Sequence, residues 1–235
     1  MKLKKIISAV LVTIILTGWS SFIFGSEDSL YDFLWLDKDK SVYVLQNKQF
    51  KKKGQVYTEL GYLKGMSSNF QNVNGGAISM SYFFSEEWAG EISYLHYLNK
   101  NNSDYKNIRE INETEPFVRE LISSASAILK WAPFYGKINT FNQIIYFDFI
   151  LGAGISSLKS RANLGVSNAN PNAEKEPENQ IGGVSKLELK IYVSEIWNIG
   201  TYLQSLYYNS EAPRLVNKEE IKINNDFVIY TGFSF

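Results

Sequence analysis

The chain of 235 residues contains no cysteine. This absence excludes a disulfide framework, cysteine-based metal sites and a lipid anchor on an N-terminal cysteine. Lys and Arg together number 24, as do Asp and Glu, so the formal net charge is zero. The sequence therefore carries no electrostatic footprint for nucleic acid. We expect no nucleic-acid partner and no cofactor.

Long apolar runs are also lacking, except for one at the N-terminus. Three lysines within the first five residues precede an uncharged, apolar stretch at 6–16. This stretch is shorter than the roughly 20 residues that a membrane-spanning helix needs. We therefore predict a cleavable signal peptide at 1–25, cut after Gly25, with an uncleaved N-terminal anchor as the alternative. Without a spanning helix, the mature chain could enter a membrane only as a closed barrel, because lipid leaves the backbone no other hydrogen-bond partners.

Aromatic residues are abundant, with 15 Tyr and 15 Phe. Strands and membrane interfaces both favour this excess. Apolar and polar residues also alternate with period two, the pattern of strands in a membrane barrel. The alternating segments are about 55–66, 75–84, 88–98, 123–133, 144–155, 183–193, 197–208 and 226–235, and every proline is expected outside the strand interiors.

These segments predict an all-β protein, a transmembrane antiparallel up-and-down β-barrel of about eight strands. We expect the barrel to span 55–235 in the bacterial outer membrane, after a periplasmic N-terminal segment at 26–54. The connections alternate between short and long, as periplasmic turns and extracellular loops do. Turns at 85–87 and 194–196 and a link at 135–143 are the short ones; the loops are 67–74, 99–122, 157–182 and 209–225, with a short helix expected at 113–122.

Two aromatic patterns support the membrane interpretation. Trp88, Trp131 and Trp197 each lie where a strand meets the short-turn side, which predicts an aromatic belt at one membrane interface. The last strand ends in Phe235 and carries Phe233, Ile229 and Phe227 on the same face. A final amphipathic strand ending in Phe resembles the recognition signal of the barrel-assembly machinery. We therefore expect that machinery and the outer-membrane lipids as partners.

Two separated motifs resemble a poorly characterised family. The first is Val44-Leu45-Gln46-Asn47-Lys48-Gln49-Phe50-Lys51-Lys52-Lys53-Gly54, and the second runs from Trp131-Ala132-Pro133-Phe134-Tyr135-Gly136-Lys137 to Phe147-Asp148. Both are similar to motifs of the outer membrane beta-barrel domain proteins best known from myxobacteria. The resemblance covers most of the mature chain and implies an outer-membrane barrel. It implies no catalytic residues, because no activity defines that family.

Charged residues at the strand positions that face the lumen are the main candidates for a functional site. An eight-stranded barrel is just wide enough for its interior side chains to fill it, so these charges should pair with one another. We predict a ladder in which Lys130 lies between Glu91 and Asp148, with Lys190 on the far side of Asp148. A stagger of two residues between strands would let Lys186 replace Lys190. The full set of expected lumen charges is Glu59, Glu91, Lys130, Asp148, Lys186, Glu188 and Lys190.

Catalytic and metal sites are poorly supported. His96 is the only histidine, and Leu98 stands where a barrel hydrolase of the Ser–His type would have its serine. The loop residues Glu110, Glu113 and Glu115 could bind a hard cation, but a solvated loop is the simpler interpretation. We therefore expect no enzyme activity and no metal.

The main functional hypothesis is a small barrel with a side-chain-filled lumen. It would act as a structural or surface-interaction protein, with a surface or periplasmic protein partner, through its extracellular loops or its periplasmic segment. A narrow outer-membrane channel is the alternative, in which 41–50 and 113–122 add strands and the lumen is wet. A lipid-modifying enzyme is a third hypothesis.

Overall fold

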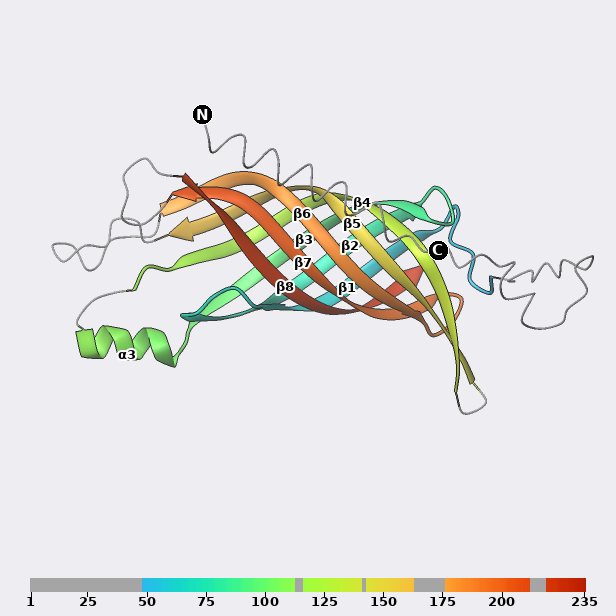
Figure 1. Ribbon diagram of the computed structural model, residues 1–235, viewed down its shortest axis with the longest axis horizontal. Coiled ribbons are helices and arrows are strands. Elements are labelled where there is room, and N and C mark those ends of the chain that lie inside the picture. Colours follow the sequence, from blue (N-terminus) through green and yellow to red (C-terminus); the bar gives the residue numbers. More distant parts are fainter. Residues whose placement is uncertain (1–47, 113–115, 141–142, 163–175, 212–218) are drawn as a thin grey trace, which may run out of the picture. The chain divides into compact units, whose positions relative to one another are not determined.

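Eight antiparallel strands form a closed barrel in sequence order, with β1 paired to both β2 and β8 (Figure 1). The computed structural model describes residues 48–112, 116–140, 143–162, 176–211 and 219–235. The predicted signal peptide and residues 26–47 lie outside this part of the chain. The strands are β1 (Val56–Gly65), β2 (Gln71–Phe83), β3 (Trp88–Asn101), β4 (Arg119–Thr140), β5 (Gln143–Ala162), β6 (Glu176–Tyr192), β7 (Trp197–Glu211) and β8 (Glu219–Ser234).

The alternation of side chains produces a barrel that is polar inside and apolar outside. On β3, for example, Glu91 and Ser93 are buried in the lumen, whereas Ile92 and Tyr94 face outward and are exposed. Neighbouring residues of a strand point to opposite faces, so the two sets separate cleanly. A charged interior with an apolar exterior is the arrangement of an outer-membrane-type barrel. The predicted fold class is therefore confirmed.

The hairpin of β4 and β5 is longer than the sequence suggested. Residues 135–143 were expected to be a link, but the two strands stay paired from Phe134↔Phe149 to Thr140↔Gln143. No strand of the described chain continues alongside β4 beyond the Trp88↔Trp131 pair. This part of the hairpin therefore projects beyond the barrel at the short-turn end (Figure 1).

The expectation that every proline lies outside the strand interiors is wrong for one residue. Pro133 lies within β4 at a register irregularity between Trp131 and Phe134. A bulge leaves one residue outside the regular ladder, so the missing N–H of proline is tolerated there. Pro177 lies at the start of β6, where it pairs with Arg161.

The one helix among the described residues also differs from its prediction. It is α3 (Ser103–Asn112), not a helix at 113–122, and residues from Arg119 onward belong to β4. The Asn102 side chain accepts a hydrogen bond from the backbone N–H of Tyr105 and so caps the helix N-terminus. No described helix is both long and apolar enough to span a membrane.

The lumen is organised in layers along the barrel axis. At the short-turn end lies an apolar layer, and in the half nearer the long loops a second apolar cluster is interspersed with buried polar side chains such as Gln204 and Asp226. On β1, Tyr57 belongs to the first layer and Leu63 to the second, while the buried Glu59 lies between them. On β6, Tyr192 and Val184 flank the charged residues in the same way. Apolar side chains thus enclose the central charges from both ends.

The closed hydrogen-bonded ring predicts heat modifiability. A closed barrel leaves no edge strand to fray, so the ring resists detergent until boiled. Unboiled protein should migrate differently from boiled protein on a detergent gel, with a known barrel as the positive control. Identical migration of the two samples, when the control shifts, would contradict a closed ring.

Candidate functional site

Six charged side chains meet in the middle of the lumen. Three are carboxylates and three are ammonium groups, so their formal charges cancel. Each residue is at most 4% exposed. We call this set the lumen charge cluster: Glu59 on β1, Glu91 on β3, Lys130 on β4, and Lys186, Glu188 and Lys190 on β6.

Lys130 lies at the centre of the cluster. Its Nζ is 2.7 Å from Glu91 Oε2 and 2.7 Å from Glu188 Oε2. Glu59 Oε1 lies 3.9 Å away. One ammonium group on β4 therefore joins carboxylates from β1, β3 and β6 across the lumen.

The two lysines of β6 complete the pairing. Lys186 Nζ donates hydrogen bonds to both oxygens of Glu91, at 2.8 and 2.9 Å. Lys190 Nζ donates to Glu59 Oε1 at 2.8 Å and lies 3.6 Å from Glu188 Oε1. Every carboxylate of the cluster thus contacts at least two ammonium groups.

Neutral donors satisfy further carboxylate oxygens. The Tyr230 hydroxyl donates to Glu188 Oε1 at 2.6 Å. The Ser79 hydroxyl donates to Glu59 Oε2 at 2.8 Å. Hydrogen bonds to ionised acceptors are the strong ones, and they matter most where water is excluded.

Aromatic rings cover two of the ammonium groups. Lys186 Nζ lies 3.9 Å from the ring centroid of Tyr202. Lys190 Nζ lies 4.3 Å from that of Tyr57. The electron-rich ring faces offset part of the cost of removing these cations from water.

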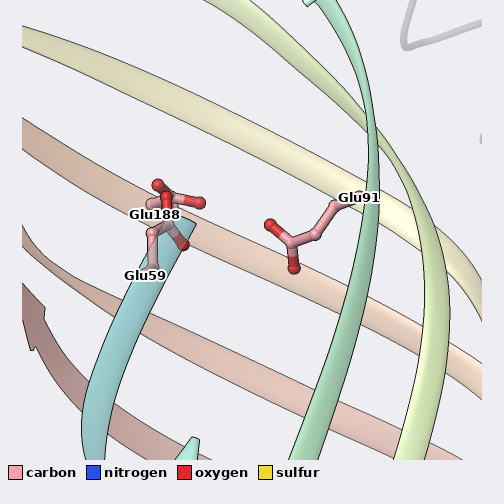
Figure 2. Close-up of side chains that lie close together, drawn as sticks. All are labelled: Glu59, Glu91 and Glu188. Carbon is pink, nitrogen blue, oxygen red and sulfur yellow. The ribbon is translucent and has the colours of Figure 1, made fainter. Parts of the chain in front are cut away.

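The three carboxylates alone would look like a metal site. Figure 2 shows Glu59 and Glu188 side by side, with Glu91 reaching toward them from the other side of the lumen. Carboxylate oxygens of all three residues lie within 4.8 Å of one another. Three lysines already neutralise this acidic group, and a divalent cation there would meet three positive charges. The donor set therefore fits an ion-paired lumen and not a metal centre.

A further lysine enters the lumen from outside the strands. Lys52 precedes β1, yet it is 0% exposed, and its Nζ donates to Asp148 Oδ2 at 2.8 Å. The Tyr192 hydroxyl donates to the same oxygen at 2.6 Å. Burial lowers the pKa of the Lys52 ammonium from its usual value, and the charge of Asp148 opposes that shift. We call these three residues the lysine anchor.

Aromatic stacking extends the lysine anchor over the short-turn mouth. The ring of Phe50 stacks on Tyr192 at 4.8 Å between centroids and meets Tyr146 edge-on at 5.3 Å. The backbone N–H of Phe50 donates to the Tyr135 hydroxyl at 3.3 Å. Residues 50–52 therefore close this end of the lumen with an aromatic cap above a buried ion pair.

The structure changes two pairs of the predicted charge ladder. All seven candidate residues are buried in the lumen, and Lys130 does contact Glu91. Lys130 does not pair with Asp148, however, and Lys190 pairs with Glu59 and Glu188 instead. Asp148 and Lys190 are cross-strand neighbours, as predicted, but the Lys190 ammonium group binds Glu59 and Lys52 pairs with Asp148.

Several partners were missed because they do not belong to a simple charge pattern. Lys52 lies outside every strand, so the alternation of inward and outward side chains does not apply to it. Tyr57, Tyr192, Tyr202 and Tyr230 have inward parity, which could have marked them as lumen residues. Their role as donors or ring partners depends on cross-lumen distances that alternation does not give.

The predicted belt residues all lie on the outer surface. Trp88, Trp131 and Trp197 are 39%, 40% and 43% exposed. Trp88 and Trp131 are cross-strand partners whose rings stack at 6.0 Å between centroids. Trp197 pairs with Phe233 on the neighbouring strand. The rings therefore lie next to the short-turn side, where an interfacial belt belongs.

The predicted assembly-signal residues share the outer face of β8. Phe235, Phe233 and Ile229 are exposed, and Phe227 is half-buried. The backbone of Phe235 exchanges two hydrogen bonds with Val56 and so closes the ring. Recognition by the assembly machinery stays a prediction.

The residues considered for chemistry are not brought together. His96 is exposed on the outer face of β3, and Glu110 is exposed on α3. Glu113 and Glu115 lie outside the described residues. The expected absence of enzyme activity stays a prediction.

Comparison with known proteins finds only distant structural likeness. No protein-family model and no curated protein sequence matches the chain, so affiliation with the myxobacterial group stays a prediction. The N-terminal β-barrel domain of Pseudomonas aeruginosa OprF is 14% identical with a TM-score of 0.47, covering 78% of this chain and 98% of that one. OprG from Pseudomonas aeruginosa is 11% identical with a TM-score of 0.45, covering 80% and 99%. Neisserial surface protein A is 16% identical with a TM-score of 0.43, covering 77% and 94%. Likeness at this level gives no information about function.

Removing Lys130 alone should be strongly destabilising. Lys130→Met leaves a net negative charge in the closed lumen, and breaking a buried ion pair in this way costs about 3–5 kcal/mol. Lys130→Met/Glu188→Gln restores neutrality and keeps an acceptor for Tyr230, so it should lose less than about half of that free energy of unfolding. Urea unfolding of the folded barrel in detergent micelles measures both, with Lys106→Met at an exposed position of α3 as the control. Equal losses in the single and double variants would mean that water screens the cluster.

The lysine anchor should protect the N-terminal segment from trypsin. In Asp148→Ala the Lys52 ammonium loses its buried counter-charge, so the segment leaves the mouth and the lysines around it become cleavable. We expect cleavage near Lys52 to be at least about tenfold faster than in wild type, since losing a buried charge pair exceeds 1.4 kcal/mol. Asp226→Ala, which removes a buried carboxylate nearer the long loops, is the matched control. Unchanged cleavage in Asp148→Ala would show that Lys52 does not hold the segment.

Proposed function

We propose that this chain is a closed, non-conducting bacterial outer-membrane barrel that acts as a structural or surface-interaction protein. The single observation that carries the proposal is the charge-neutral lumen charge cluster, enclosed between two apolar layers. A continuous water path would solvate these charges and expose them. Their burial instead supports a lumen filled by side chains.

The short-turn end adds a second closure. Lys52 and Phe50 fill the mouth with an ion pair and stacked rings, so ions would meet an obstruction there as well. A narrow channel, the alternative, would need both the anchor and the cluster to move. No described residues outside β1–β8 add strands to widen the ring.

The long-loop end is the part best suited to contact a partner. β5, β6 and β7 stay paired to Ala162, Glu176 and Glu211, well beyond the central cluster. A pocket of about 350 Å³ opens there, lined by both apolar and polar residues, among them Phe70, Tyr97, Asn99, Phe117 and Tyr208. A rigid barrel that carries such an end fits an interaction role, because a fixed scaffold positions its binding loops.

Electrical recording in planar bilayers tests the closed state. The folded protein should give no discrete conductance steps at concentrations where a general porin, as the positive control, gives many. Insertion is verified by the shift between boiled and unboiled protein recovered from the bilayer lipid. Steady, reproducible steps from the inserted wild-type protein would contradict the closed barrel and favour the channel.

A further inference from the structure

The long-loop end of β8 is an open strand edge. β7 pairs with β8 as far as Glu211↔Glu219, whereas β1 pairs with β8 only as far as Gly65↔Asp226. Residues 219–224 of β8 therefore have a neighbouring strand on one side only. In the part of the chain that the structure describes, no other strand takes the place of β1 along this edge.

The hydrogen bonds of Asn225 show which backbone groups this edge presents. Its C=O accepts from the N–H of Met66, and its N–H donates to Ser67 Oγ, so its backbone faces the β1 side. Alternate residues of an antiparallel strand direct their backbone groups to the same side. The N–H and C=O groups of Ile223 and Ile221 therefore also face the β1 side, where β1 has already ended. Among the described residues, none forms a hydrogen bond with them.

A pocket of about 350 Å³ lies against this edge. Its lining includes Ile223 and Asn224 of β8 and residues 67–70, which follow β1. The Ile223 side chain is on the outer face of β8 and is 54% exposed, so Ile223 contributes to the pocket through its backbone. Four aromatic residues also line the pocket, namely Phe70, Tyr97, Phe117 and Tyr208.

The cations at this pocket already have partners. Lys222 Nζ donates to Glu220 Oε2 at 2.9 Å, and Arg119 forms an ion pair with Glu178. A charged ligand would have to compete with these pairs. Edge and pocket together therefore favour an uncharged occupant that offers peptide groups to the edge and apolar side chains to the aromatic rings.

We propose that this edge binds an extended, uncharged segment of another protein by strand addition. The main chain of the segment pairs with Ile221 and Ile223, and its alternate side chains enter the aromatic pocket. The inference rests on the proposed surface-interaction role, for which it names the class of partner. It is independent of whether the lumen conducts.

A second copy of the chain does not fit the edge of β8. Two barrels in one membrane have the same orientation, so a two-fold axis along the membrane normal would relate them. Their β8 strands would then tilt in opposite senses. At a tilt of about 40° each, the two edges would cross at about 80° and could not form a ladder. A flexible segment of a partner has no such restriction.

Hydrogen exchange of the full mature protein in lipid nanodiscs tests the pairing. The probe is a peptide of about five residues with blocked termini, in which phenylalanine alternates with threonine. Strand addition gives the amides of Ile221 and Ile223 a hydrogen-bond acceptor. Their exchange should therefore slow about tenfold when the peptide concentration is about tenfold above its Kd. The same peptide with N-methyl groups at its pairing amides should leave this exchange unchanged.

Variants of the edge separate strand addition from simple apolar binding. Ile223→Pro removes an N–H that faces the β1 side and leaves the β7–β8 ladder intact, so it should weaken peptide binding about fivefold, the value of one hydrogen bond. Ile223→Val keeps the N–H and is the matched control. Ile181→Pro alters β6, which is also paired on one side only at this end. Both controls should stay within about twofold of wild type.

Replacing the phenylalanines of the peptide by threonine should weaken binding at least about tenfold, because the aromatic pocket no longer buries a ring. Peptide that binds without slowing exchange at Ile221 and Ile223 would overturn strand addition while the surface-interaction role survives. Equal losses for Ile223→Pro and Ile223→Val, equally tight binding of the N-methylated peptide, or no binding at all would also overturn it. Folding of each variant is verified by its heat-dependent gel shift.

Discussion

Each charge that strand alternation turns into this lumen needs an opposite charge within reach, because a narrow, filled barrel has no bulk water to solvate it. Lys130 meets this requirement for three strands at once, since its ammonium group contacts Glu91 and Glu188 and lies near Glu59. The hydroxyls of Tyr230 and Ser79 donate further hydrogen bonds to the carboxylates of Glu188 and Glu59. The barrel interior is thus held by electrostatic pairing, in contrast to the apolar core of a soluble protein.

The same requirement explains why the N-terminal segment enters the barrel. Asp148 lies directly opposite Lys190 in the register of β5 and β6, but the Lys190 ammonium group binds Glu59 and lies near Glu188. Without Lys52, Asp148 would therefore be a buried charge with only a tyrosine partner. A lysine from outside the strands supplies the missing charge, and Phe50 covers it. Closure of the mouth is therefore a consequence of balancing one carboxylate.

Most of the fold could be predicted from period-two alternation. The eight strands, the short turns after Phe83 and Tyr192, the three outward tryptophans and the inward charges all depend on local sequence alone. Exact pairing could not be predicted, because it depends on stagger: a shift of two residues exchanges the partner of a lysine without changing its face. Lys52 could not be found for a different reason, since it belongs to no strand and acts through contact with a residue 96 positions away.

The β4–β5 hairpin has a consequence for association between chains. Residues 134–140 of β4 extend past the last pair with β3 and present one edge of backbone groups to solvent at the short-turn end. Residues 176–181 of β6 and 219–224 of β8 are likewise paired on one side only, at the long-loop end. Such an edge can template pairing with another strand, and charged residues are the usual protection against it. Exposed Lys137 stands midway along this edge, between the apolar Phe134 and Ile138. A single lysine thus protects this open edge of β4 against intermolecular β-sheet growth.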